Sequence, residues 1–205
     1  KGGWRGCKLF FFSSQTLRFC PECVIEHRAI AGEAGWFTVH QVPGMNHCHL
    51  HLCPLVDTTI SAASKTLTAL DDVACTVGWR ILSKPSDAGI AYAQVVGALF
   101  KIGQPLPPLK FLNLAVAKAL FGANARVEKL KVAWQIATRI TDQLPSVAAV
   151  FGSDPVTQIR RIRSELRESV QPIFGIATLA AIAISGRSLE ALIRDAIVEL
   201  ENPGP

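Results

Sequence analysis

Two short pairs of metal-binding side chains lie in the first quarter of the chain, separated by residues 24–47. The first pair is Cys20 and Cys23 within RFCPEC, and the second is Cys48 and His51 within NHCHLH. Two intervening residues in a tight turn let both side chains of a pair point at one ion, and the loop brings the second pair round. Three thiolates and one imidazole suit a tetrahedral Zn²⁺ ion. The spacing predicts a zinc site at these four residues.

Two other interpretations of the first pair stay open. A redox dithiol would need a neighbouring strand and helix, and it would leave Cys48 and His51 unexplained. A disulfide framework is disfavoured because the 205 residues hold only 6 cysteines and show no export signal. Cys7 and Cys75 have no partner at a metal-binding spacing, so we expect buried thiols at these positions.

Further histidines and a cysteine crowd the second pair, so the identity of single ligands stays open. His47, His49 and Cys53 lie next to the pair, and His40 lies in the loop between the pairs. Each could replace a predicted ligand. For His40 we expect a structural role, packed beside Trp36 and hydrogen-bonded to the backbone. Four protein ligands leave no position for a water molecule, so such a site is structural and argues against an enzyme.

Composition and charge are those of a folded chain with a weak basic character. Hydrophobic residues make up 49% of the sequence, the formal net charge is +5 and the mean hydropathy is +0.29. This charge permits nucleic-acid binding without being diagnostic of it. The longest apolar run, 173–185, is about 13 residues, which is short of the roughly 20 that span a bilayer. We therefore expect a cytoplasmic protein with no membrane partner, and, because the chain begins at Lys1, a fragment or a processed product.

After Pro54 the sequence changes to helical periodicity with proline and glycine breaks. The expected helices cover 60–82 (with Thr58, Thr59 or Ser61 as its cap), 89–102, 109–121, 126–141, 145–151, 154–169, 172–185 and 188–200. The last two are expected to form an antiparallel hairpin at Gly186. Strands are expected only in the zinc finger, because no other segment shows sustained alternation. The predicted fold is mostly α, with a small zinc-finger module followed by a helical bundle with helix-turn-helix-like units.

We divide the chain into three parts on this pattern. The zinc-finger module covers 1–56, a helical segment packing on the finger covers 57–106, and a helical domain with helix-turn-helix-like units covers 107–205. The boundary between the last two lies in GQPLPP, 103–108, a stiff break between two helices.

The helix expected over 154–169 combines a core face with an arginine stripe. Ser153-Asp154-Pro155 is a typical helix start. The residues expected to face the core are Val156, Ile159, Ile162, Leu166 and Val170. Those of the stripe are Arg160, Arg163 and Arg167, with Arg161 turned further out. Guanidinium groups in this arrangement can contact successive phosphates or guanines of a nucleic acid. The alternative is a solvated face with ion pairs to Glu165 and Glu168.

Catalytic motifs are missing from the sequence. There is no GxxxxGK[ST] loop, no GxGxxG after a strand, no GxSxG elbow and no HExxH. The adjacent carboxylates Asp71 and Asp72 point to different faces of the helix expected there. We therefore expect a protein that is not an enzyme.

The segment around the cysteine and histidine pairs resembles the TniQ/TnsD family of transposon target-selection proteins. The shared pattern is an aromatic residue before CPxC, a glycine, an aromatic pair, HQxPG, and CxxH followed by a leucine. The positions that carry it are Phe19, Cys20, Pro21, Cys23, Gly32 or Gly35, Trp36, Phe37, His40, Gln41, Pro43, Gly44, Cys48, His51 and Leu55. A looser likeness covers 151–182. The segment usual before the finger is not recognisable in 1–17, and the second pair is unusually rich in histidine.

The resemblance implies an adaptor for target-site selection in DNA transposition. Such a protein recognises target DNA, or a guide-RNA effector complex bound to it, and recruits an AAA+ ATPase regulator, while other subunits supply ATP hydrolysis and strand transfer. Two alternatives remain. One is a zinc-containing DNA-binding transcription regulator that acts as a homodimer on a palindromic operator. The other is a purely protein-binding scaffold.

Overall fold

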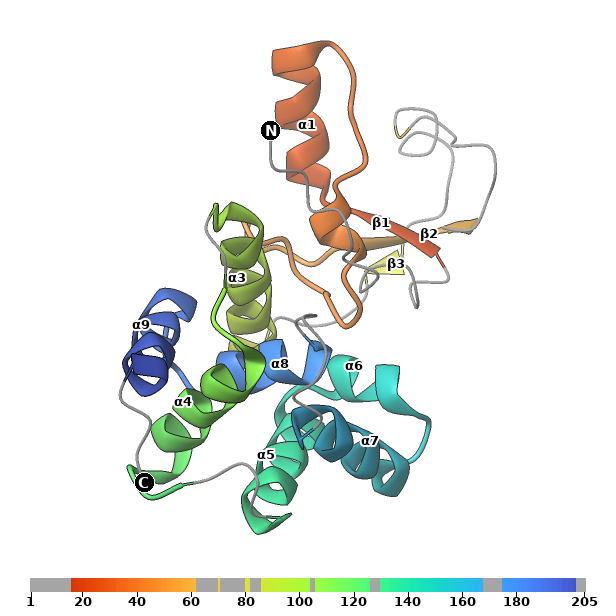
Figure 1. The fold of residues 1–205 in the computed structure, drawn as a ribbon. Coiled ribbons are helices and arrows are strands. Elements are labelled where there is room, and N and C mark those ends of the chain that lie inside the picture. Colours follow the sequence, from red (N-terminus) through yellow and green to blue (C-terminus); the bar gives the residue numbers. More distant parts are fainter. Residues whose placement is uncertain are drawn as a thin grey trace.

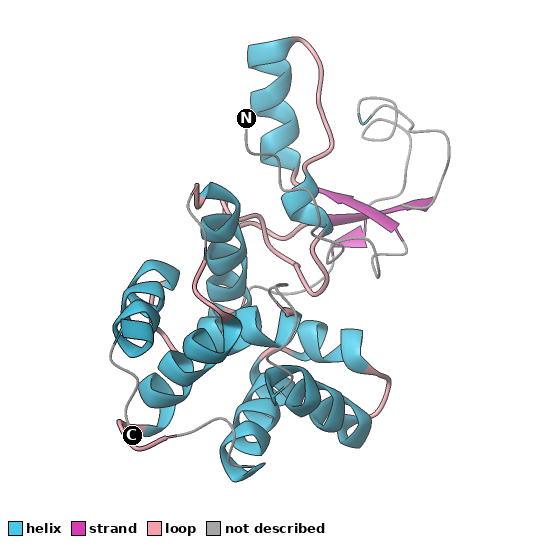
Figure 2. Ribbon diagram, in the orientation of Figure 1, coloured by secondary structure: helices cyan, strands magenta, loops and turns pink. Residues whose placement is uncertain are grey.

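The computed structural model describes residues 16–61, 70, 80–81, 86–103, 106–125, 130–167 and 175–201. Most of the helix expected over 60–82 lies outside these ranges. Six single residues that entered the sequence-based expectations also lie outside them: Cys7, Asp71, Asp72, Cys75, Glu168 and Val170. Within the described residues the chain is mostly helical, as predicted, with one small sheet (Figure 2). Strands were expected only in the zinc-finger module, 1–56, but the strands over 56–61 and 80–81 extend the sheet beyond it.

The sheet has three antiparallel strands in the order β1-β2-β3. The strands are β1 (Thr16–Phe19), β2 (Val56–Ser61) and β3 (Arg80–Ile81). Phe19 pairs with Val56, and Val56 pairs with Ile81 on its other side. The helix expected over 60–82 is therefore wrong at both ends. Thr58 is not a helix cap, because its hydroxyl donates to the Leu17 carbonyl at 2.7 Å, and the β-branched run around it favours a strand.

A helix that the sequence analysis missed begins at the first cysteine. Helix α1 (Pro21–Ala31) has Cys20 as its N-cap, with the Cys20 sulfur accepting from the Cys23 backbone N–H at 3.5 Å. Pro21 occupies the first turn, where no hydrogen-bond donor is lost, and Glu22 favours the positive end of the helix dipole. Pro21 and Glu22 together form a sequence pattern that is typical of a helix start. The first metal-binding pair thus sits on a helix N-terminus.

The other helices follow the expected ranges closely (Figure 1). They are α3 (Asp87–Lys101), α4 (Leu109–Phe121), α5 (Leu130–Gln143), α6 (Pro145–Ala148), α7 (Pro155–Arg167), α8 (Ile176–Ile184) and α9 (Leu189–Glu201). Two 3₁₀ turns, η2 (Thr38–Gln41) and η3 (Ala149–Phe151), complete the described elements. Ser86 caps α3 with a hydrogen bond of 3.1 Å from Gly89 N to its hydroxyl.

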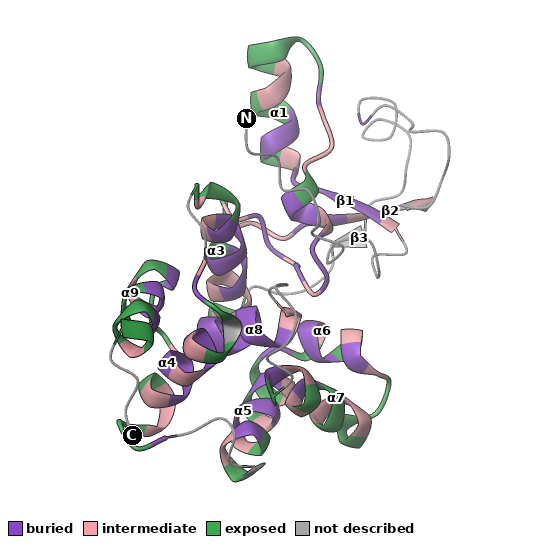
Figure 3. Ribbon diagram, in the orientation of Figure 1, coloured by how far each residue is buried: buried purple, intermediate pink, exposed green. Residues whose placement is uncertain are grey.

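Helix α8 lies at the centre of the helical part and is buried along almost its whole length (Figure 3). It packs against α3, α5 and α7, with further contacts to α4 and α6. Its sequence is apolar on all sides because it has neighbours on all sides. No single described helix is long and apolar enough to cross a membrane. Only α8 and α9 taken together reach that length and apolar composition, and the chain bends by 106° between them.

The antiparallel hairpin expected for the last two helices is wrong. Gly186 does form the turn, with a left-handed φ of 69°, but α8 and α9 meet at 106°. The apolar face of α9 packs against α4 instead of α8, and Lys118 of α4 forms an ion pair with Glu199 of α9. Gly186 in the sequence indicates the turn, whereas the helix against which α9 packs depends on the tertiary structure.

The loop that carries the second metal-binding pair lies directly against the helices. Cys20, Cys23 and Cys48 belong to the same buried core as Leu112 of α4 and Ile182 of α8. Ser146 of α6 donates to the Gly44 carbonyl at 3.2 Å. A Cβ atom on Gly44 would lie 2.7 Å from a Val147 methyl, and its φ is 77°, so only glycine fits there. The finger and the helices therefore share one core.

Candidate metal centre

Two tight backbone segments present the four predicted ligands. Cys20 and Cys23 lie at the start of α1, which fixes their spacing on the first helical turn. Cys48 and His51 lie in a turn closed by hydrogen bonds from Cys48 N to Cys53 O at 2.8 Å and from Leu52 N to Cys48 O at 3.0 Å. The turn also aims backbone N–H groups at the Cys48 sulfur, as is suited to a thiolate ligand.

Arg18 and Gln41 hold the strand before the first pair against the loop before the second. The Gln41 amide exchanges hydrogen bonds with the Arg18 backbone, at 2.9 Å from Arg18 N and 2.7 Å to Arg18 O. The buried Arg18 guanidinium donates to the carbonyls of Met45 and Val42, at 2.5 and 3.0 Å. These contacts hold the strand that leads to the first pair against the loop that leads to the second pair.

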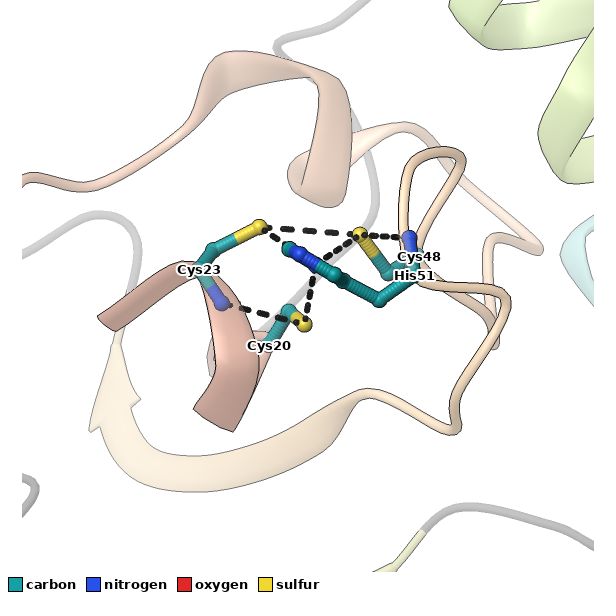
Figure 4. Close-up of side chains that lie close together, drawn as sticks. All are labelled: Cys20, Cys23, Cys48 and His51. Atoms are coloured by element: carbon teal, nitrogen blue, oxygen red, sulfur yellow. Dashed lines mark hydrogen bonds between the residues drawn. The ribbon is translucent and has the colours of Figure 1, made fainter. Parts of the chain in front are cut away.

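The four ligand atoms converge on the space between the two segments (Figure 4). His51 Nδ1 lies 3.4 Å from Cys20 Sγ, 3.3 Å from Cys23 Sγ and 3.6 Å from Cys48 Sγ. Cys23 Sγ lies 3.6 Å from Cys48 Sγ. One ring nitrogen cannot donate a hydrogen bond to three sulfurs, so pairwise hydrogen bonding does not account for the arrangement.

The spacing fits the edges of a coordination tetrahedron. Bonds of about 2.3 Å to sulfur and about 2.0–2.1 Å to nitrogen place a tetrahedral sulfur and nitrogen about 3.6 Å apart and two sulfurs about 3.8 Å apart. The observed sulfur–nitrogen separations of 3.3, 3.4 and 3.6 Å and the sulfur–sulfur separation of 3.6 Å are close to these values. The cluster of Cys20, Cys23, Cys48 and His51 could therefore hold a metal ion, and its donor set is consistent with zinc.

Protonation in the cluster also favours a cation. The pKa of Cys48 is lowered because the Cys20 and Cys23 thiols donate to its sulfur, whereas the pKa of Cys20 is raised by its contacts with Cys23 and Cys48 and by burial. Without a cation, therefore, not all three thiols ionise together. A divalent ion removes this conflict, because it lets every sulfur bind as a thiolate.

Glu26 fixes the ring of His51 in the orientation that metal binding needs. Its carboxylate lies 3.1 Å from His51 Nε2, and accepting this hydrogen bond raises the pKa of His51. With Nε2 carrying the proton, Nδ1 offers its lone pair to the centre of the cluster. A carboxylate behind a ligating histidine is common in metal sites and orients the ring.

The other candidate ligands take separate positions. Cys53 Sγ lies 3.3 Å from Cys20 Sγ but is not within reach of all four atoms of the cluster. His47 is buried against α3 near Gly89. His40 groups with Cys48 and His49 instead of with the four predicted ligands.

The expectation for His40 is wrong in two respects. The ring packs against Phe37, with centroids 5.3 Å apart, and against His49, at 6.2 Å. Trp36 packs against Phe19 instead. Neither ring nitrogen of His40 has a hydrogen-bond partner within the described residues.

The described cysteines, Cys20, Cys23, Cys48 and Cys53, are free thiols. Their closest sulfur–sulfur separations are 3.3 and 3.6 Å, whereas a disulfide bond needs about 2.05 Å. The disulfide framework that the sequence left open is thus not formed among these residues. A redox dithiol would leave Cys48 and His51 unexplained, whereas in the structure they belong to the same cluster as the first pair.

The arginines predicted to bind nucleic acid lie on α7. Asp154 caps this helix as expected, with its carboxylate accepting from Thr157 N at 2.9 Å, and this hydrogen bond lowers the pKa of Asp154. Ile162 and Leu166 are buried and Ile159 is half-buried, but Val156 is 76% exposed, so the core face is shorter than predicted. Val156 lies in the first turn of α7.

The four arginines differ in their surroundings. Arg160 and Arg167 are exposed. Arg161 is also exposed but folds back to donate to the Phe151 carbonyl at 3.0 Å. Arg163 is half-buried, and its buried Nε has no hydrogen-bond partner among the described residues. The carboxylate of Glu165 accepts from Ala177 N at 3.0 Å, at the start of α8. The structure thus brings Arg160 and Arg167 to the surface of one helix.

No family model, curated protein or solved structure matches the chain.

Proposed function

We propose that the chain is a target-site selection adaptor for DNA transposition, stabilised by a structural Zn²⁺ ion at Cys20, Cys23, Cys48 and His51. The observation that carries the proposal is the convergence of these four ligand atoms at tetrahedral spacing. They are the residues at which the motif resembles the TniQ/TnsD finger. Four protein ligands complete a tetrahedral shell, so the ion has a structural role and leaves the chemistry of transposition to other subunits.

The arginine helix supplies the nucleic-acid side of the proposal. Helix α7 contains four arginines and one glutamate, PVTQIRRIRSELR, and that glutamate bonds to the start of α8. Arg160 and Arg167 lie seven positions apart, which places them on one face two turns apart. Exposed guanidinium groups at this spacing can each contact a phosphate of the target.

The short segment before α7 supports a helix-turn-helix-like arrangement. Helix α6 and the 3₁₀ turn η3 run into Gly152, and α7 follows after a tight turn in which Gln158 donates to the Gly152 carbonyl at 2.9 Å. In such motifs the second helix enters the major groove and reads base edges. The proposed target is therefore duplex DNA, contacted by α7, and the proposed protein partner is an AAA+ ATPase regulator.

The metal part is tested by elemental analysis of the purified chain and by thermal unfolding with and without a strong chelator. We expect bound zinc and a lowered melting temperature after chelation. A folded chain without bound metal, whose melting temperature is unchanged by the chelator, would refute the metal centre.

The DNA part is tested by fluorescence anisotropy on duplex DNA over a range of salt concentrations. Each phosphate contact contributes a slope of about −0.9 to the plot of log K against log salt. Arg160→Ala with Arg167→Ala should reduce the slope by about 2. The matched control is Arg187→Ala with Arg194→Ala on the far helix α9 and its turn, which removes the same charge. A slope that is equal in both double variants would refute contact through α7.

The adaptor role itself is tested by reconstitution of the chain with a transposition AAA+ ATPase regulator and duplex DNA. We expect a ternary complex of chain, DNA and ATPase. Operator binding as a dimer without an ATPase would favour the transcription regulator, and binding of a protein partner without any DNA shift would favour the scaffold.

A further inference from the structure

A second group of metal-binding atoms lies beside the proposed zinc centre and shares one residue with it. The ligand atoms of His40, Cys48 and His49 all lie within 4.8 Å of one another. The rings of His40 and His49 come from opposite ends of the loop 40–49, with centroids 6.2 Å apart. Two imidazoles and a thiolate form a donor set that suits Zn²⁺ and related ions.

Three ring nitrogens of this group are buried without a hydrogen-bond partner among the described residues. His40 has no exposed surface, and neither of its ring nitrogens has a hydrogen-bond partner within the described residues. The Nδ1 atom of His49 is likewise buried without a partner there. Buried polar atoms are nearly always paired, because leaving them unpaired loses the hydrogen bonds they made to water. An unexplained group of this kind calls for a ligand.

A hydrogen bond to the neighbouring sulfur explains less than a cation does. A bond from His40 to Cys48 would satisfy one nitrogen of His40 and would leave His49 as it is. A cation accepts a lone pair from each ring at once and from the sulfur as well. We propose that His40, His49 and Cys48 form a second metal site, in which the Cys48 thiolate bridges two divalent ions.

Charge favours such a pair of ions. Three thiolates and a neutral imidazole leave the proposed zinc centre with a net charge of −1 (+2 − 3), and a second divalent ion bound by neutral imidazoles brings the pair to +1 (+4 − 3). The Cys48 thiolate has lone pairs for two ions. Three protein ligands leave one position for solvent, and half-buried His49 forms the edge of the site.

The neighbouring helix is shaped to admit His49. A Cβ atom on Gly97 of α3 would lie 2.4 Å from His49 Cδ2 and 2.7 Å from its Cβ. Any side chain at position 97 would therefore displace the ring from its place beside Cys48. His47 is also buried, and its ring nitrogens have no partner in the part of the chain that the structure describes. It lies against Gly89 and outside the group, which makes it a matched control.

The test is a Co²⁺ titration of the metal-free full chain under reducing conditions, followed by visible absorption, with Zn²⁺ stoichiometry measured by elemental analysis. We expect two ions per wild-type chain, one in His49→Ala and two in His47→Ala. A single ion in the wild type, or a second ion that persists in His49→Ala, would overturn the second site and leave the proposed zinc centre standing. No bound ion would overturn both. The wild-type stoichiometry decides the question even if His49→Ala fails to fold.

Discussion

Tyr92 of α3 donates a hydrogen bond of 2.9 Å to the carbonyl of Pro43, and both groups are buried. The contact ties the helical part to the loop between the two metal-binding pairs. Tyr92→Phe removes the donor but keeps the ring, so the Pro43 carbonyl is left unpaired. We expect a loss of about 1–3 kcal/mol in the free energy of unfolding. Urea denaturation of the metal-loaded chain measures it, with Thr138→Val as the control, since the Thr138 hydroxyl bonds to its own helix at the surface.

The burial of Tyr92 should also make the free energy of unfolding decrease at alkaline pH. Complete burial raises the pKa of Tyr92, with the Glu165 carboxylate adding to the rise. The unfolded chain therefore loses this proton first, at about pH 10, so stability is full below that pH and falls as the pH rises toward the folded-state pKa. Tyr92→Phe should show a flatter loss of stability above pH 10 than wild type. If the free energy of unfolding fell equally with pH in both proteins, the raised pKa of Tyr92 in the folded state would be contradicted.

Gly97 and His49 form a second contact between helix and loop, which a double-mutant cycle can isolate. Alanine normally favours a helix over glycine by about 1 kcal/mol, but at position 97 its Cβ would clash with His49. We expect Gly97→Ala to destabilise the chain by about 1–3 kcal/mol. The same change in a His49→Ala background should cost less, because the contact with Cδ2 is gone and only the Cβ of residue 49, at 2.7 Å, remains in the way. Gly103→Ala, at a position with open space, is the steric control.

Thr178 of α8 and Asn113 of α4 form a buried polar link at the centre of the helices. The Thr178 hydroxyl donates to Asn113 Oδ1 at 3.1 Å, and Asn113 Nδ2 donates to the Leu166 carbonyl at 2.9 Å. Thr178→Val keeps the shape and removes the donor. We expect a cost of about 1–3 kcal/mol by thermal or urea unfolding. Thr141→Val, whose hydroxyl bonds only to its own helix, should cost less; equal losses would refute the link.

Cys53 and Cys20 lie close together but should differ in metal binding. Cys53 is outside the group of four, whereas Cys20 is one of its members. We expect Cys53→Ser to keep the metal affinity of wild type, and Cys20→Ser to lose at least about tenfold, since even residues behind a ligand contribute that much. Competition with a chromophoric chelator measures both. Loss of affinity in Cys53→Ser alone would show that Cys53 replaces Cys20 as a ligand.

Local patterns in the sequence were enough to predict the metal cluster and most helices. Cys20, Cys23, Cys48 and His51 come together because each pair is set by a turn of a few residues. The start of α7 at Asp154 is likewise a matter of neighbouring residues.

Features that depend on distant partners could not be read in this way. Strand β2 exists because β1, some 40 residues earlier, pairs with it. The position of α9 is set by α4, and the surroundings of His40 are set by Phe37 and His49 together with the burial of the loop. The periodicity of one segment does not reveal its pairing partners, so residues 60–61 and 80–81 were assigned to a helix although they lie in strands.

The close contact between Gly44 and Val147 has a consequence for recognition. The backbone at Gly44 packs directly against Val147 of α6, so the cysteine-bearing loop is in close contact with the segment that leads into α7. The finger and the arginine helix are consequently held at one separation and one angle. Any partner that engages both surfaces has to match that geometry, so selectivity can come from the distance between two docking points as well as from the chemistry at either.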